Sequence, residues 1–387
     1  FKDGIYDRPY RDPSLVNKIE GHQKTALQTA EEAITLLKNT DHILPIDPAK
    51  VNRIVVVGTP EALKVYTGTG SGKVEGYDQV DYPTGLENIY GSKIIHSRTI
   101  SDDQIRSADV VLYFINKHAG EGSDKPFVLP RVDSMVNRYA ALNKNLVVVY
   151  SGGNGLAMPW LQKTKAFVFA YLLGQQSGTA LARVISGAVS PSGKLPFTIE
   201  KSFRQSPAYD YNKMRDSSYY WGGGKRDSRM MEKFGPIDLT YKEGIYMGYR
   251  WYDKKKFAPQ FPFGFGLSYT TFDFSKLHLS STSISKDKPV MVEVTITNTG
   301  SSAGAEVAQL YIHAIHSKID RPVMALKGFK RILLKAGESK KIQIPLKLHD
   351  LAYWSETSHD WQVDHGRYEI ALGASSKDIR QKAIIQY

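Results

Sequence analysis

The sequence has 387 residues, a formal net charge of +12 and no cysteine. This length is enough for two or more domains, and a hydrophobic content of 41% allows a sizeable core. The absence of cysteine excludes disulfides and thiolate metal sites. Basic residues are interleaved with acidic ones, and the longest basic run is Lys254–Lys256, so we interpret the charge as a solvated surface and predict no nucleic-acid partner.

The first residues of the sequence do not have the pattern of a targeting signal. Phe1 is not a start methionine, and residues 1–13 are polar without an apolar signal core, so we expect the natural N-terminus to lie upstream. Residues 1–20, with Pro9, Pro13 and scattered charges, are predicted to be loop-like. No apolar run in the sequence approaches the ~20 residues of a membrane span, so no membrane span is predicted.

Residues 22–205 alternate between helical and strand patterns. This alternation predicts an α/β domain with a mostly parallel sheet covered on both faces. Short β-branched and aromatic runs predict buried strands at 53–58, 109–114, 146–151 and 166–172. Apolar residues at helical spacing predict helices at 22–39, 102–108, 131–142 and 177–185.

The pattern changes after residue 205. Residues 206–271 lack periodicity and are predicted to be an irregular linker. From residue 272 the pattern is all-β, and residues 290–297 (VMVEVTIT) alternate between apolar and polar. Residues 272–387 are therefore predicted to form a β-sandwich, with further strands at 307–313, 339–346, 367–372 and 382–387.

The predicted strand at 109–114 leads towards a carboxylate between two glycines, Gly120-Glu121-Gly122. Glycine lets a ligand approach the backbone closely, and ligands usually bind at the carboxyl ends of strands in α/β proteins. Glu121 is therefore a candidate catalytic group. The local pattern alone, however, favours an ordinary exposed loop acid.

Other chemistries find little support. The loop Gly68–Gly72 (GTGSG) lacks the Lys-Ser/Thr ending of a Walker A loop, so nucleotide binding is not predicted. No G-x-S-x-G elbow of a serine hydrolase occurs. The histidines are scattered, so we expect no metal site and no cofactor. His118 is either a substrate contact or a solvated loop residue.

A set of motifs, in this order, resembles the C-terminal half of glycoside hydrolase family 3, the β-glucosidase and β-xylosidase family. Each motif is weak alone, but together they span nearly the whole chain. They are YRDPSL at 10–15, AITLLKNTDHILP at 33–45, GEGSD at 120–124, GQQSGTALARVISGAVSPSGKLP at 174–196, YKEGIYMGYRWY at 241–252, FPFGFGLSYTT at 261–271 and LKGF at 326–329.

The resemblance implies a specific domain organisation. Members of the family typically have a (β/α)8-like barrel, then an α/β sandwich domain and, in many cases, a fibronectin-III-like domain. Residues 1–21 would be the linker from a missing N-terminal barrel, 22–205 the α/β sandwich and 272–387 the fibronectin-III-like β-sandwich. The barrel would carry the nucleophilic aspartate, and we expect it as a partner of this chain.

The resemblance also implies a role for Glu121, which matches the acid/base glutamate of the family, with Asp124-Lys125 matching its Asp-Arg pair. Retaining hydrolysis needs two carboxylates about 5–5.5 Å apart, one attacking and one protonating the leaving oxygen. Glu121 would donate that proton and then activate water, which requires a pKa raised by burial or by the anionic nucleophile. Glu75 remains the alternative donor.

Further contacts are expected around Glu121. The Gly-Ser-Gly loop of relatives lines the cleft, so Ser71 and Lys73 either line it here or form a simple surface turn. Asp124 and Ser123 are candidate substrate contacts together with His118. Ser123 stands where many relatives have Tyr or Phe, which removes an expected aromatic wall near the leaving-group sugar.

We therefore expect the acid/base-bearing portion of an exo-acting retaining β-glycosidase, foremost a β-glucosidase that removes terminal β-linked sugars from oligosaccharides or glycosides. A β-xylosidase or α-arabinofuranosidase of the same family, or a non-catalytic carbohydrate-binding or scaffold protein, are the alternatives. The family also implies a secreted or periplasmic location.

Overall fold

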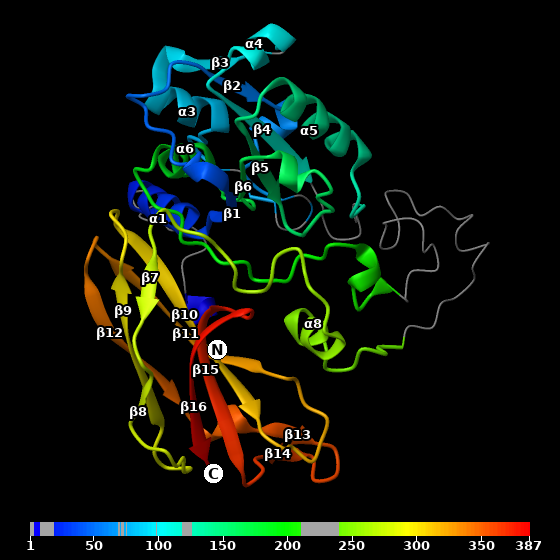
Figure 1. The fold of residues 1–387 in the computed structure, drawn as a ribbon, viewed down its shortest axis with the longest axis vertical. Coiled ribbons are helices and arrows are strands. Elements are labelled where there is room, and N and C mark those ends of the chain that lie inside the picture. The colour runs from blue at the N-terminus through cyan, green and yellow to red at the C-terminus, as the bar shows by residue number, and fades with distance from the viewer. Residues whose placement is uncertain are drawn as a thin grey trace, which may run out of the picture.

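The computed structural model describes residues 4–7, 19–68, 70, 73–74, 76–97, 99–117, 126–209 and 240–387. An α/β domain stands above a β-sandwich along the long axis of the molecule, as Figure 1 shows. The α/β domain has one mixed, mostly parallel sheet, and the strands of the sandwich pair antiparallel. The predicted fold class, α/β followed by a fibronectin-III-like β-sandwich, is confirmed.

The α/β sheet has six strands in the order β1-β6-β5-β4-β2-β3. Only the edge strand β1 runs antiparallel to its neighbour, and the other strands pair in parallel. The strands are β1 (Thr35–Asn39), β2 (Ile54–Val57), β3 (Ile94–His96), β4 (Val110–Lys117), β5 (Leu146–Gly152) and β6 (Ala166–Phe169). The four strands predicted in this region are confirmed, although β4 extends three residues further, to Lys117.

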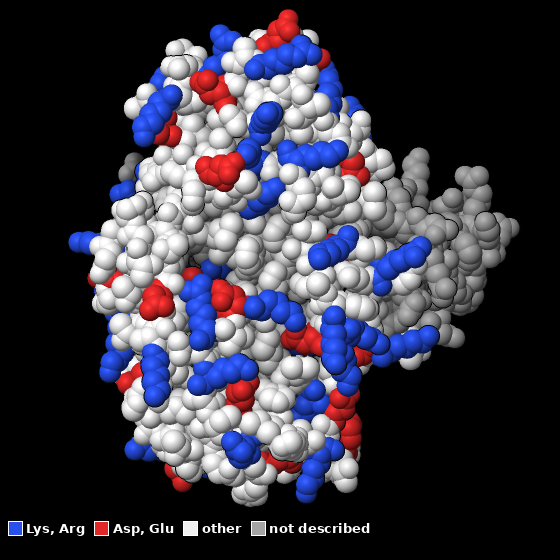
Figure 2. Space-filling model, viewed as in Figure 1, with Lys and Arg blue, Asp and Glu red and all other residues white. Residues whose placement is uncertain are grey.

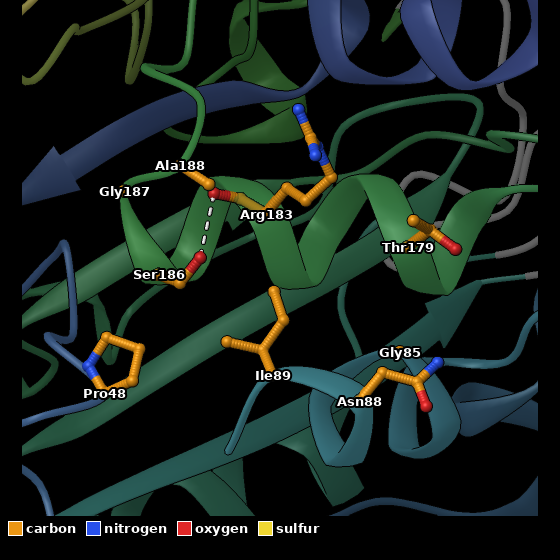
Figure 3. Close-up of a pocket in the computed structure, with 9 residues that line it drawn as sticks. All are labelled: Pro48, Gly85, Asn88, Ile89, Thr179, Arg183, Ser186, Gly187 and Ala188. Atoms are coloured by element: carbon orange, nitrogen blue, oxygen red, sulfur yellow. Dashed lines mark hydrogen bonds between the residues drawn. The ribbon is translucent and has the colours of Figure 1, made fainter. Parts of the chain in front are cut away.

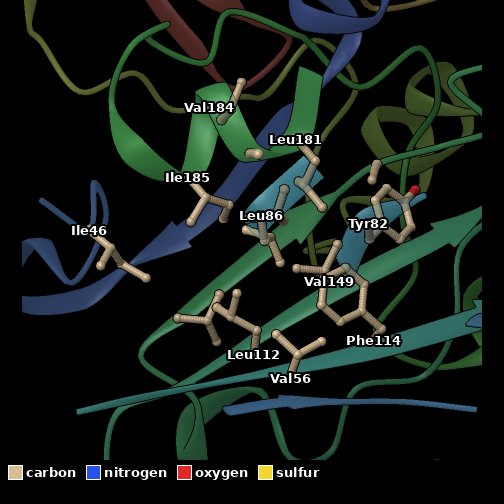
Figure 4. Close-up of a cluster of buried hydrophobic side chains, with 14 of the residues drawn as sticks. Ile46, Val56, Tyr82, Leu86, Leu112, Phe114, Val149, Leu181, Val184 and Ile185 are labelled. Carbon is tan, nitrogen blue, oxygen red and sulfur yellow. The ribbon is translucent and has the colours of Figure 1, made fainter. Parts of the chain in front are cut away.

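Helices cover both faces of this sheet (Figure 1). On one face lie α1 (Ile19–Ala33), α2 (Pro60–Leu63), α3 (Tyr82–Tyr90) and α6 (Ser177–Ser186), and on the other lie α4 (Asp102–Arg106) and α5 (Pro130–Leu142). Successive strand residues alternate between the two cores, with Val56 in one and Val55 in the other. Figure 4 shows Leu181 of α6 and Leu86 of α3 packed towards strand residues such as Val149.

Two glycines bring α3 and α6 into backbone contact. A Cβ atom added at Gly85 would lie 2.2 Å from the backbone of Gly178. A Cβ atom added at Gly178 would lie 1.9 Å from the carbonyl oxygen of Asp81, the N-cap residue of α3. The absence of both side chains therefore sets the distance between these helices.

The helix predicted at 22–39 is wrong in its second half. Helix α1 ends at Ala33, and Thr35–Asn39 forms β1, which pairs with β6. Leu36 and Leu37 are both buried, one in each core, which is the two-residue period of a strand. The apolar spacing fitted a continuous helix, but pairing with the otherwise open edge of β6 decides the conformation. Helices α2 and α3 and strand β3 were not predicted.

The β-sandwich consists of two sheets, ordered β11-β10-β15-β16 and β12-β9-β7, with β8 pairing to β9. Strand β9 alternates between buried and half-buried residues along its whole length, so one face packs into the core. The predicted strands at 290–297 and 339–346 are confirmed. The strands are β7 (Phe272–Phe274), β8 (His278–Leu279), β9 (Val290–Asn298), β10 (Gly304–Ala314), β11 (Ala325–Leu334), β12 (Ser339–Leu346), β15 (Arg367–Ser375) and β16 (Asp378–Gln386), with a separate hairpin of β13 (Tyr353–Ser355) and β14 (Asp360–Gln362).

The region predicted to be irregular contains a helix, α8 (Tyr249–Lys255), which lies beside the joint between the two domains (Figure 1). The Tyr249 hydroxyl accepts a 2.9 Å hydrogen bond from the amide of Leu326 in β11. Its ring stacks on Phe263 at a centroid distance of 4.9 Å. Here the aromatic residues pack the connection onto the sandwich.

Short 3-10 turns lie at Ile5–Asp7, Thr40–His42, Gly91–Lys93, Leu161–Lys163, Phe203–Gln205 and Leu348–Leu351.

Charge is distributed over the surface. On the face drawn in Figure 2, Lys and Arg side chains are spread over both domains, with Asp and Glu side chains between them. In the described part of the chain, no helix has the length and apolar character needed to cross a bilayer.

The glycine contact between α3 and α6 gives a first prediction. Gly178→Ala should lower the free energy of unfolding by about 3 kcal/mol. The added methyl group would collide with backbone atoms, which cannot move aside by a rotamer change as a side chain could. Gly21→Ala, also in a helix but with open space around it, should be neutral or stabilising by up to ~1 kcal/mol. Urea unfolding of both variants measures the difference, and equal effects would contradict the backbone contact.

Candidate active site

The carboxyl ends of the parallel strands β2, β4, β5 and β6 meet at one edge of the sheet. Strand β4 lies between β2 and β5, and its register with β5 continues to the pair Lys117–Gly152. In open α/β sheets ligands bind outside this edge. The segment that follows Lys117 in the sequence contains Glu121.

Lys117 closes β4 with a buried ammonium group. Its side chain is only 5% exposed, and its Nζ donates a 2.8 Å hydrogen bond to the carbonyl oxygen of Gly155, in the connection that follows β5. A buried ammonium needs such acceptors because desolvation disfavours the charged form. The last residue of β4 is therefore fixed to a neighbouring connection by its side chain as well as by the strand ladder.

The Glu200 carboxyl interacts with this ammonium, and the Tyr252 hydroxyl in turn interacts with Glu200. Burial raises the pKa of the Glu200 carboxyl, whereas the charge of Lys117 acts in the opposite direction. Burial also raises the pKa of the Tyr252 hydroxyl, and the Glu200 charge adds to this shift. Strand β4, the segment after α6 and helix α8 thus each contribute one polar group to a buried cluster. Sequence reasoning missed this cluster, since its only local signal was a lysine at the end of an apolar run.

Most residues predicted for the site lie outside the described residues. These are Ser71, His118, Glu121, Ser123 and Asp124, together with the alternative donor Glu75. Their roles remain predictions. Lys73 is described: it is exposed, and its amide closes a turn by donating a 3.1 Å hydrogen bond to the carbonyl oxygen of Gly70.

The loop that carries Lys73 lies at the carboxyl edge of the sheet. Its backbone is held by the segment after β6: the Gly174 amide donates to the Tyr66 carbonyl oxygen at 2.7 Å. The Val80 amide likewise donates to the Gln175 carbonyl oxygen at 3.0 Å. The loops after β2 and β6 are therefore joined at the edge where β4 ends at Lys117.

Exposed apolar side chains accompany these loops. Val74 and Tyr77, in the loop after β2, are 68% and 71% exposed, and Val128, ahead of α5, is 40% exposed. Large apolar side chains that gather on one surface often mark a contact with another protein surface. Three exposed apolar side chains therefore belong to the loops that follow β2 and β4.

A cavity of about 560 Å³ lies elsewhere, between α3, α6 and the turn at Pro48 (Figure 3). Its only charged side chain among the described lining residues is Arg183, which is paired with Glu31 at 2.5 Å. None of the described lining residues is a carboxylate. The cavity therefore lacks the groups that glycoside hydrolysis needs.

Comparison with known proteins identifies the family. The profile of the Glycosyl hydrolase family 3 C-terminal domain matches residues 34–249, which is more than half of the chain. The chain belongs to glycoside hydrolase family 3. A second profile, the Fibronectin type III-like domain, matches residues 306–376.

Similar proteins include the Beta-glucosidase BoGH3A of Bacteroides ovatus, which is 32% identical over 95% of this chain and 52% of its own length. The Exo-alpha-(1->6)-L-arabinopyranosidase of Bifidobacterium breve is 33% identical over 95% of this chain and 49% of its own length. The family 3 chain thus spans about half the length of the curated relatives it matches.

Solved structures agree with this assignment. The GH3 beta-glucosidase of Bifidobacterium adolescentis matches with a TM-score of 0.78 and 32% identity, over 95% of this chain and 53% of that one. The Beta-D-glucoside glucohydrolase of Trichoderma reesei matches with a TM-score of 0.79 and 29% identity, over 94% and 55% of the two chains. The resemblance read from the motifs is therefore confirmed.

The buried cluster at the end of β4 gives a second prediction. Lys117→Met should lower the free energy of unfolding by about 1–3 kcal/mol at pH 7, because it leaves a partly buried carbonyl and a partly buried carboxyl without their cation. Burial already raises the folded-state pKa of Glu200 above its ordinary 4.5, so ionising this group destabilises the fold as the pH rises through that pKa. Without Lys117 this pKa rises further, so the loss should be smaller at pH 4 than at pH 7.

Urea unfolding at both pH values measures this. The control is Lys50→Met, which removes a lysine with an 83% exposed side chain and should change the unfolding free energy by less than ~0.5 kcal/mol. An equal loss at pH 4 and pH 7 for Lys117→Met would contradict the coupling to Glu200.

Proposed function

We propose that this chain is the acid/base-bearing part of an exo-acting retaining β-glucosidase that removes terminal β-linked sugars from oligosaccharides or glycosides. The observation that carries the proposal is the family 3 membership together with the strand order, which puts β4 in the middle of the carboxyl edge just before Glu121. Glu121 protonates the leaving-group oxygen in the first step. In the second step it takes a proton from the attacking water.

The second carboxylate comes from an N-terminal barrel domain. Relatives are about twice as long as this chain, and the exposed Val74, Tyr77 and Val128 lie in loops at the carboxyl edge. A barrel docked at this edge covers these side chains and brings its nucleophilic aspartate to Glu121. Because closing such a site excludes water, it also raises the pKa of a carboxyl within it.

The family further supports a secreted or periplasmic location. Finding a signal sequence in the upstream coding region would test this location.

A second candidate substrate class has a specific basis. Two relatives, 33% and 34% identical, are named exo-alpha-(1->6)-L-arabinopyranosidases. Aryl β-glucosides, α-L-arabinopyranosides, β-xylosides and α-L-arabinofuranosides assayed side by side with the complete protein would rank the alternatives. A protein that binds oligosaccharides but hydrolyses none of them would instead be a carbohydrate-binding scaffold.

The third prediction is that the 387-residue chain alone is inactive. It supplies one catalytic carboxylate where retaining hydrolysis needs two. Aryl β-glucoside hydrolysis should appear only when the barrel half is present, either in the same chain or added as a separate chain. Tyr77→Asp should weaken recovery of activity from two separate halves, because it puts a charge into the proposed interface. Robust hydrolysis by the chain alone would refute the proposal.

The fourth prediction concerns Glu121 in the complete protein. Glu121→Gln should slow hydrolysis of substrates with poor leaving groups by about 10²–10⁴-fold, the usual contribution of general acid catalysis. A dinitrophenyl glycoside needs little protonation, so its glycosylation step should survive while the following hydrolysis slows. Azide, which needs no base, should partly rescue Glu121→Ala and give a β-glycosyl azide, because two displacements retain the configuration.

Glu75→Gln serves as the matched variant. If Glu121 is an ordinary loop acid and Glu75 is the donor, Glu121→Gln will leave the dependence on the leaving group unchanged. Azide will then rescue Glu75→Ala and not Glu121→Ala. One activated and one unactivated substrate with both sets of variants decide between these assignments.

A further inference from the structure

A cavity of about 530 Å³ lies at the opposite edge of the α/β sheet from Lys117. Four lysines line it: Lys38 of β1, Lys144 ahead of β5, Lys163, and Lys165 ahead of β6. The other described lining residues are neutral, and none of them is a carboxylate. A cavity of this size is within the usual range for small-molecule sites.

Three of these lysines are held in place by hydrogen bonds. The Lys38 Nζ donates to the carbonyl oxygen of Leu161 at 2.7 Å. The Lys163 Nζ donates to Oδ1 of Asn137, which lies on α5, also at 2.7 Å. Lys165 pairs with Asp41. These three side chains are already ordered in the folded protein, so a ligand that binds them loses less free energy to the ordering of side chains.

Few carboxylates among the described residues balance the positive charge of this cavity. Four ammonium groups lie around it, and the carboxylate of Asp41 pairs with one of them. Burial, and then the positive charge of Lys165, lower the pKa of Lys38. Both effects disfavour the cation at Lys38, and an anion placed in the cavity would favour it by opposite charge. Lysine ammonium groups bind phosphate as point charges.

We propose that this lysine pocket binds a small molecule that carries a phosphate or sulfate group. The ligand's oxyanion lies among Lys38, Lys144, Lys163 and Lys165. The neutral remainder of the ligand occupies the rest of the cavity, where hydroxyl and amide side chains such as Gln162 offer hydrogen bonds. The site lies at the amino ends of β5 and β6, so it is separate from the proposed catalytic edge and does not depend on the proposed function.

Calorimetric titrations with sodium phosphate, sodium sulfate and sodium chloride, all at one ionic strength, test the pocket. Phosphate and sulfate should bind saturably and raise the melting temperature, and chloride should do neither. Glucose 6-phosphate tests whether the ligand is a phosphorylated sugar. If glucose 6-phosphate binds more tightly than inorganic phosphate, the pocket takes a phosphorylated sugar. If the two bind equally, the pocket recognises the oxyanion alone. Binding of phosphate and sulfate no better than chloride would overturn the proposal.

Variants localise the binding. Lys38→Met should weaken phosphate binding about tenfold or more, because it removes a charge-assisted contact. Lys144→Met, at an exposed position, should weaken binding without lowering the melting temperature, so it remains informative if Lys38→Met unfolds. Lys50→Met, outside the cavity, should keep the affinity within about twofold. The proposal is wrong if neither pocket variant weakens binding, or if Lys50→Met weakens it as much as they do.

Discussion

One backbone segment, residues 261–267, is hydrogen-bonded to both domains. On the α/β side it pairs with Leu195 at 2.8 and 2.9 Å and with the Leu36 carbonyl at 2.8 Å. On the sandwich side it accepts from the Ser376 amide at 3.0 Å and from the Gln309 side chain at 3.0 Å. Buried backbone groups that lose such partners are costly, so the sandwich cannot rotate against the α/β domain without breaking these hydrogen bonds.

A buried ion pair crosses the same joint. The ammonium of Lys194 lies 2.7 Å from a carboxylate oxygen of Glu306, and the two side chains are only 13% and 6% exposed. The ammonium also donates a 2.8 Å hydrogen bond to the carbonyl oxygen of Gly266, in the connecting segment. It therefore has one acceptor in the sandwich and one in this segment. A buried pair of this kind adds little net stability because desolvation offsets the attraction, but separating the two charges is strongly unfavourable. The pair therefore acts mainly to fix the relative placement of the domains.

The parallel sheet separates two chemically different edges. At its carboxyl edge, Lys117 anchors the end of β4 beside apolar loops, which suits a site completed by a second domain. At its amino edge, Lys38 and Lys165 belong to a cavity without an acidic lining residue among those described. Because the central strands run in the same direction, their carboxyl ends lie at one edge of the sheet and their amino ends at the other. The proposed active site and the proposed lysine pocket therefore lie at opposite edges of one sheet and do not overlap.

The sequence by itself determined the elements whose pattern is strong. The apolar run of β4 and the alternation of apolar and polar residues along Val290–Asn298 are compatible with few conformations other than a strand. The order of the motifs identified the family. Tertiary structure decided the rest. Thr35–Asn39 became a strand because β6 offered an open edge, although its apolar spacing also suited a helix. The partners of Lys117 and the gathering of lysines around Lys38 come from segments distant in sequence, and only folding brings such charges close enough to interact.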